Sequence, residues 1–205
     1  MDDVRAAARR LEGVAVRTAL MESEALSDVA GVPIFLKLES EQPTGAFKLR
    51  GAWNYLGCIP EQRLQTGIIT YSSGNHGQAV AFAAGKKGVT AVIVMPETAP
   101  RWKVAGVRRW GGEVVFAGVT SAAREAKARE MAAELGLEVI PPYNHADIIA
   151  GQGTVGLEIV HQLGEVQHVV VPVGGGGLIA GVTVAVSALK RAADIVGVEP
   201  DGAPS

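Results

Sequence analysis

Residues 169–181 read Val-Val-Val-Pro-Val-Gly-Gly-Gly-Gly-Leu-Ile-Ala-Gly. The apolar run before the glycines is typical of a buried strand, and the apolar residues after them recur at the spacing of a helix. The four glycines, Gly174–Gly177, leave the turn between strand and helix without side chains. Backbone N–H groups in such a turn can converge on one phosphate, and the helix dipole adds partial positive charge. The stretch therefore predicts a phosphate-binding loop. The alternative is a plain flexible connector, although a short βα loop rarely needs four glycines.

Composition limits the class of protein. The chain has 205 residues, of which 48% are hydrophobic, so it can bury a substantial core. Its 19 basic and 21 acidic side chains give a net charge of −2, and no basic stretch supports a nucleic-acid partner. A single cysteine, Cys58, excludes an internal disulfide and fits a reducing compartment. The first residues lack the apolar segment of a signal peptide, and no apolar run is long enough to span a membrane. We expect a soluble, cytoplasmic protein without a membrane partner.

The order of predicted elements indicates an α/β fold. Strands alternate with helices from Gly67 onward, which predicts a parallel sheet with right-handed crossovers. Turn-forming and helix-breaking residues at 56–66 and at 141–142 mark two domain boundaries. They predict a small α/β domain at 67–143, inserted into a larger domain formed by 1–66 and 144–205. The predicted strands are 33–38, 68–71, 91–95, 113–116, 137–140, 169–173 and 195–198. The predicted helices are 4–11, 46–56, 75–87, 101–110, 121–135, a long one at 145–163 with an interruption at Gly151 or Gly153, and one after the four glycines.

A second stretch places a lysine at a helix start. Thr44–Ala52 reads Thr-Gly-Ala-Phe-Lys-Leu-Arg-Gly-Ala, so that Lys48 falls in the first turn. The helix dipole disfavours a positive charge there and lowers the pKa of the amine. An amine with a lowered pKa is suited to Schiff-base chemistry with a carbonyl compound. Taken alone, such a lysine is more often a solvated surface residue than a reactive amine.

A third stretch follows the predicted strand at 68–71. Ser72–Gly77 reads Ser-Ser-Gly-Asn-His-Gly and offers hydroxyls, an amide and free backbone N–H groups at a helix start. These groups are suited to binding a carboxylate or an aromatic hydroxyl. The alternative is an ordinary helix cap, for which Ser73 or Asn75 would serve.

In this order, the three stretches resemble the fold-type II pyridoxal-phosphate enzymes of the threonine dehydratase and serine racemase family. The resemblance covers nearly the whole chain and includes the sequences at 92–96, 149–154 and 197–200. It implies a tryptophan synthase β-like fold with two domains and parallel sheets flanked by helices. The family's chains continue well beyond position 205, so the resemblance also implies that the large domain is incomplete here. Family members generally form dimers or tetramers, and a homodimer or tetramer is expected of the full-length protein.

The resemblance also implies roles for individual residues. Lys48 would hold pyridoxal 5'-phosphate through a Schiff base and later move the substrate α-proton, and Ser73 would act as the acid–base group on the opposite face. Phe47 would pack near the cofactor ring, and Asn75 would bind its hydroxyl. The phosphate would lie against Gly174, Gly175, Gly176, Gly177 and Leu178. The substrate carboxylate would be held by Ser72, Ser73, Gly74 and His76. A stabilising cation would bind Glu199 and the Ala203 carbonyl, although the family's next acidic ligand falls at Ser205.

The implied reaction is β-elimination of a hydroxy amino acid, such as threonine or serine, to a 2-oxo acid and ammonia. Tyr143 occupies a position where several family members carry an asparagine near the substrate, so the substrate choice stays open. Two alternatives within the resemblance are a serine or amino-acid racemase and a truncated, non-catalytic fragment. A rival outside it is a dinucleotide-binding domain, because Gly175, Gly177 and Ala180 match the degenerate glycine fingerprint and Glu199 ends the next strand. That rival leaves Lys48 and Ser72–Gly77 without a role.

Overall fold

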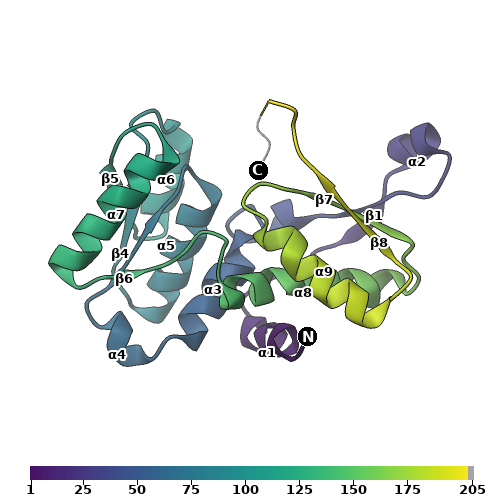
Figure 1. The fold of residues 1–205 in the computed structure, drawn as a ribbon, viewed down its shortest axis with the longest axis horizontal. Helices are drawn as coiled ribbons and strands as arrows, with labels where there is room; N and C mark the ends of the chain where they lie inside the picture. The colour runs from purple at the N-terminus through teal and green to yellow at the C-terminus, as the bar shows by residue number, and fades with distance from the viewer. Residues whose placement is uncertain (203–205) are drawn as a thin grey trace.

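A computed structural model describes residues 1–202 of the chain. Its two parts lie side by side in Figure 1, one around a four-stranded sheet and the other around two smaller sheets. Helix α3 (Lys48–Cys58) lies between them, and α8 (Ala146–Leu163) runs from its contact with α3 into the second part. Within the described residues, no helix is long and apolar enough to cross a membrane.

The four-stranded sheet is parallel and has the order β5-β4-β3-β6. All four strands lie within the small domain predicted at 67–143, whose boundaries stay a prediction. Helices α5 and α6 pack on one face of the sheet and α7 packs on the other. The elements of this part are β3 (Ile68–Tyr71), α5 (Asn75–Lys87), β4 (Ala91–Met95), α6 (Arg101–Arg109), β5 (Glu113–Phe116), α7 (Ser121–Leu135) and β6 (Glu138–Val139).

Successive side chains of the two central strands, β3 and β4, point to opposite faces of the sheet, so they contribute to two separate layers of the core. Ile68 of β3 and Ile93 of β4 point to the layer under α5 and are fully buried. Ile69 and Val92, their neighbours in sequence, point to the layer under α7. Because both faces are covered, these strands read as continuous apolar runs, which is why the sequence predicts them well.

The second part contains an antiparallel pair, β1 with β2, and a parallel pair, β7 with β8. The antiparallel pair departs from the expectation of parallel sheets alone. Both strands are three residues long and mostly exposed; the predicted strand at 33–38 contains β2, whereas β1 was not predicted. The elements are α1 (Asp2–Leu11), β1 (Leu20–Glu22), α2 (Glu24–Ala30), β2 (Phe35–Lys37), a 3-10 helix η1 (Glu39–Glu41), α3, α4 (Glu61–Leu64), α8, β7 (His168–Pro172), α9 (Gly177–Leu189) and β8 (Asp194–Val198).

Helix α8 runs without a break through Gly151 and Gly153, so the predicted interruption is wrong. Both glycines instead permit close helix packing. A Cβ on Gly151 would lie 2.6 Å from the Cα of Gly51 in α3, and a Cβ on Gly153 would lie 2.9 Å from the carbonyl oxygen of Gly181 in α9. The glycines therefore let α8 contact helices on both sides, and this contact outweighs their low helix propensity.

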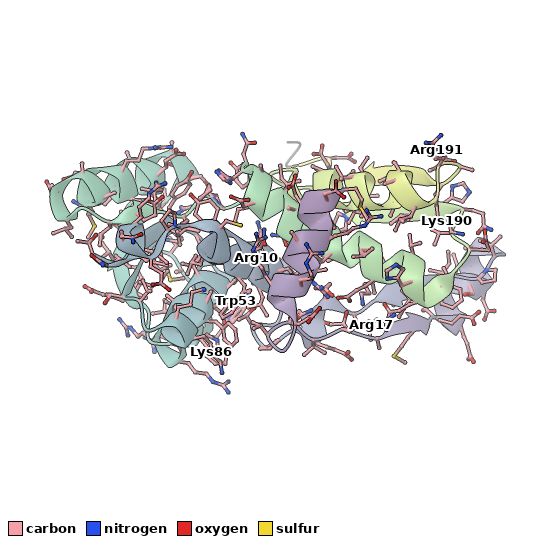
Figure 2. The ribbon with its side chains drawn as sticks, turned by 90° about the horizontal axis from the view of Figure 1, so that it is seen from below. Arg10, Arg17, Trp53, Lys86, Lys190 and Arg191 are labelled. Atoms are coloured by element: carbon pink, nitrogen blue, oxygen red, sulfur yellow. The ribbon has the colours of Figure 1, made fainter. Side chains whose placement is uncertain are left out.

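Helix α1 packs across α3 and α8. Arg10 of α1 lies beside Trp53 of α3 in Figure 2, and the Trp53 indole donates a hydrogen bond of 2.7 Å to the Arg10 carbonyl. The Arg10 guanidinium also donates to the Asn54 side chain at 3.0 Å. Trp53 therefore has a packing role between α1 and α3.

The β7–β8 sheet is covered on one face only. Val169 and Val171 point toward α8 and α9 and are buried. Val170, Val196 and Val198 point the other way and are 66%, 45% and 50% exposed. Among residues 1–202, this face of the β7–β8 sheet therefore carries exposed apolar side chains.

Candidate functional site

A pocket of about 320 Å³ opens where α3, the start of α5 and the segment after β6 meet. It brings together two of the three stretches singled out in the sequence. These contribute Lys48, Ser72, Ser73, Gly74, Asn75 and His76 to its lining. The remaining lining residues are Tyr71, Lys103, Ser121, Arg124, Glu125, Pro142 and Tyr143.

Lys48 is the first residue of α3, and its ammonium donates a hydrogen bond of 2.8 Å to the Pro142 carbonyl. The ammonium lies 5.5 Å from the centre of the Phe47 ring and 5.9 Å from that of Tyr143. Burial lowers the pKa of Lys48 to about 8, because the charged form is poorly solvated there. The predicted lowering is found, but its cause is burial rather than the helix dipole. A minor fraction of the amine, about a tenth at pH 7, is therefore neutral near physiological pH.

Ser72 and Ser73 form the turn between β3 and α5. Gly74 is the N-cap of α5, which has no side-chain cap, so the cap alternative for Ser73 or Asn75 is wrong. The Ser72 hydroxyl accepts a hydrogen bond of 3.0 Å from the Gly74 amide. The first N–H groups of an uncapped helix have no partner within the helix, and they remain available to an anion at this end of the pocket.

His76 lies under this turn and is only 4% exposed. Among the described residues, neither of its ring nitrogens has a hydrogen-bonding partner of regular geometry. Burial, followed by the charge of Lys48, lowers the pKa of His76 to about 3, and the Ile140 backbone opposes this shift only in part. The imidazole is therefore neutral at physiological pH. Its one polar contact among the described residues is therefore the Ile140 backbone.

The four glycines follow β7 as predicted, and α9 begins at Gly177. Gly176 is the N-cap, with a φ of +74° that favours glycine. A Cβ on Gly175 would overlap the Tyr143 ring. The glycine turn thus lies behind Tyr143, which separates it from Lys48, and it does not contribute to the pocket lining. Phe47 and Leu178 pack against the same cluster of buried valines.

Several pocket residues carried no signal in the sequence. Lys103 comes from α6, and Arg124 and Glu125 come from α7. These helices follow β4 and β5, whose carboxyl ends lie at the same edge of the sheet as that of β3. Ligands of parallel α/β sheets bind at this edge, and the strand order would have been the only available clue.

The predicted cation site stays a prediction. Glu199 follows β8 and is not part of the pocket lining, and Ala203 lies outside the described residues. In residues 1–202, no group of three or more His, Cys, Asp or Glu side chains could hold a metal ion. His145 caps α8 by accepting a hydrogen bond from the Asp147 amide at 3.2 Å.

Comparison with known proteins identifies the family. A family model described as "Pyridoxal-phosphate dependent enzyme" matches residues 11–205. The chain is 43% identical over 206 residues to an L-threonine ammonia-lyase of Thermotoga maritima, covering all of this chain and 51% of that protein. It is 40% identical over 200 residues to a serine racemase of Arabidopsis thaliana, covering 98% of this chain and 60% of that protein.

A solved structure of maize serine racemase superposes with a TM-score of 0.95 at 38% identity, covering 98% of this chain and 61% of that one. The chain thus spans between about half and three fifths of the length of these relatives. The matched family binds pyridoxal phosphate, which favours the phosphate-loop interpretation of the four glycines over the dinucleotide fingerprint. On these grounds, the chain belongs to the family of pyridoxal-phosphate dependent enzymes.

Proposed function

We propose that the protein catalyses β-elimination of a hydroxy amino acid, releasing a 2-oxo acid and ammonia. The observation that carries the proposal is the meeting of Lys48, whose pKa is lowered to about 8, with the uncapped start of α5 in one pocket. An amine that is partly neutral at pH 7 can react with a carbonyl group and can accept a proton. The start of α5 offers N–H groups to a carboxylate next to it.

The residues present fit pyridoxal phosphate. Lys48 lines the pocket, and its amine has no carboxylate partner among the described residues. The four glycines place backbone without side chains at the start of α9, and Tyr143 packs against Gly175 there. Gly174, Gly175, Gly176, Gly177 and Leu178 are proposed to hold the phosphate, with Phe47 beside the ring and Asn75 at its hydroxyl. When bound, the cofactor acts as an electron sink that stabilises negative charge at the substrate α-carbon.

The chain's own residues then have distinct tasks. The Lys48 amine takes the proton from the substrate α-carbon, which lets the β-hydroxyl leave. The Ser72–Gly74 turn and the first N–H groups of α5 orient the substrate carboxylate. Neutral His76 supports this turn from below without adding a positive charge, because its pKa is far below physiological pH. Placement and proton transfer are the contributions that a protein adds to such a cofactor.

The test is covalent labelling of Lys48. The protein is mixed with pyridoxal phosphate, reduced with borohydride and digested, and the labelled peptide is identified by mass spectrometry. We expect visible absorption before reduction, the label on Lys48, and loss of both in Lys48→Ala. Lys87→Ala, at an exposed lysine that stacks on Trp53, is the control and should behave like the unaltered protein. A label spread over surface lysines, or full turnover of threonine and serine by Lys48→Ala, would show the proposal to be wrong.

Racemisation is the second candidate. The observation that favours it is that Ser73 lines the pocket together with Lys48. The Ser73 hydroxyl would exchange a proton with the substrate on the face opposite to Lys48. Ser73→Ala separates the two reactions. Production of the 2-oxo acid from L-serine should persist in this variant, whereas any formation of D-serine should fall below detection.

A further inference from the structure

A buried network of charged side chains surrounds Arg50 of α3, which is only 1% exposed. The Nε and Nη2 atoms of Arg50 donate hydrogen bonds of 2.8 Å to the two carboxylate oxygens of Glu39 in η1. Its Nη1 and Nη2 atoms donate to the two carboxylate oxygens of Glu158 in α8, at 2.6 and 2.9 Å. Each carboxylate is therefore bound through two N–H groups, the strongest and most directional geometry open to a guanidinium.

The network is complete and balanced in charge. Arg50 also donates to the Thr154 hydroxyl at 3.1 Å and to the Val16 carbonyl at 3.2 Å. Lys37 of β2 donates to Glu158 at 2.6 Å, so two cations face two carboxylates. Replacing a buried ion pair with apolar side chains is often neutral for stability, so stability is a weak reason for such a network. What the fixed pairing supplies is a single arrangement of the segments that carry it.

Arg50 lies two residues after Lys48 on the same helix. Two positions along an α-helix correspond to a rotation of about 200°, so the two side chains point to nearly opposite sides of α3. Lys48 lines the candidate site, whereas Arg50 lines a separate cavity of about 180 Å³ between α1 and α8. A rotation of the first turn of α3 would move both side chains at once. The contacts that fix Arg50 therefore also fix the direction of Lys48.

The other polar contacts between α3 and α8 lie further along the helix. The Gly51 amide donates to the Gln152 side chain at 3.2 Å, and the Asn54 side chain donates to the Asp147 carbonyl at 2.7 Å. These contacts hold the middle of α3. The helix begins without a side-chain cap, so the first turn is held from behind by Arg50.

We propose that Arg50 is a positioning residue for the candidate site. Its paired bonds to Glu39 and Glu158 fix the rotation of the first turn of α3 and so keep the Lys48 amine inside the pocket. This inference deepens the proposed function, because it concerns the amine to which that function assigns the cofactor. Arg50 does not line the pocket and acts through the helix. The fork geometry of the guanidinium, rather than its charge alone, is what Lys48 depends on.

The test measures the pKa of the Lys48 amine, which is low because the amine is buried. Modification of Lys48 by trinitrobenzenesulfonate is followed against pH by peptide mass spectrometry, and the midpoint should lie near pH 8 in the unaltered protein. Arg50→Lys keeps the charge but cannot hold both carboxylates through paired N–H groups. Its midpoint should rise by at least about half a pH unit, because a less fixed first turn lets water reach the amine. A smaller rise, or a fall, overturns the inference.

Lys37→Gln is the matched control. It removes a whole charge from the same network, but Lys37 belongs to β2 and the bonds from Arg50 to Glu39 and Glu158 remain. The midpoint for Lys48 should therefore stay at the value of the unaltered protein. A rise in Lys37→Gln equal to that in Arg50→Lys would mean that any loosening of the network moves the pKa of Lys48, and it would overturn the positioning role.

A second variant guards against misfolding, because Arg50 is buried. Folding of each variant is checked by circular dichroism. If Arg50→Lys is unfolded, Glu39→Gln decides, since it keeps the shape of the side chain and removes one of the two carboxylates paired with Arg50. It should raise the midpoint for Lys48 in the same direction. A midpoint in Glu39→Gln equal to that of the unaltered protein then overturns the inference.

Borohydride labelling of the same preparations separates this inference from the proposed function. A protein that is labelled on Lys48, with the same midpoint in Arg50→Lys as in the unaltered chain, contradicts only the positioning role. A protein whose midpoint moves as expected but that takes up no cofactor contradicts only the proposed function.

Discussion

The two parallel sheets of this protein differ in how they are covered. In the four-stranded sheet, α5 and α6 cover one face and α7 covers the other, and the central strands are fully buried. In the β7–β8 sheet, α8 and α9 cover one face, while Val170 on the other face is 66% exposed. The difference shows that one part of the chain completes its own core, whereas the other presents an apolar surface that isolated soluble domains avoid.

The largest expected effect follows from removing side-chain volume in the covered sheet. Ile93→Ala should lower the free energy of unfolding by about 2–5 kcal/mol, because Ile93 is fully buried in the central strand β4. Val170→Ala, on the exposed face of β7, should change it by less than about 0.5 kcal/mol. Urea denaturation of both variants measures the contrast. Similar losses in the two variants would mean that the β7–β8 face is covered in solution and would break the comparison.

The next effect concerns the site between the two parts. The pKa of Lys48 is lowered to about 8, so the neutral amine increases as the pH rises through 8. The rate of modification of Lys48 by trinitrobenzenesulfonate, followed by peptide mass spectrometry, should rise about tenfold per pH unit between pH 6 and 7.5 and level off above pH 9. A rate still rising steeply at pH 10 would show that the Lys48 amine is well solvated and that the pocket around it is open to water.

The smallest effect on stability is expected from Val170→Lys. A lysine on the open face of β7 should leave the free energy of unfolding within about 0.5 kcal/mol, because no packing is lost there. It should, however, reduce concentration-dependent association, measured by light scattering, because a charge interrupts the apolar face. Strong destabilisation, or unchanged association, would contradict the description of this face as uncovered. Val171→Lys, which buries the charge against α9, serves as the destabilising reference.

The sequence-based predictions are more accurate for the part around the four-stranded sheet than for the part that contains the β7–β8 sheet. The bounds of β3, β4, β5, α5 and α7 are those predicted, because buried strands and helices with clear starts and stops leave local signals. Thr120 caps α7 and Gly88 ends α5 in the left-handed region, as such signals require. The elements β1, α2 and α4 were missed, since each is short and α2 has no buried residue. The interruption of α8 predicted at Gly151 or Gly153 is absent, because the helix propensity of glycine says nothing about the neighbouring helices that these two residues contact.

The site divides in a similar way. Lys48, the Ser72–Gly77 stretch and the four glycines are recognisable in the sequence because each combines unusual residues with a helix start, and the chemistry of a helix start is local. The sequence by itself therefore determined the family, the cofactor that this family binds and most of the secondary structure. Only the tertiary structure brought Lys103 and Arg124 to the same pocket. Such pairings depend on which strand ends share a sheet edge and on how burial removes water from a charge, and neither is encoded in the spacing of neighbouring residues.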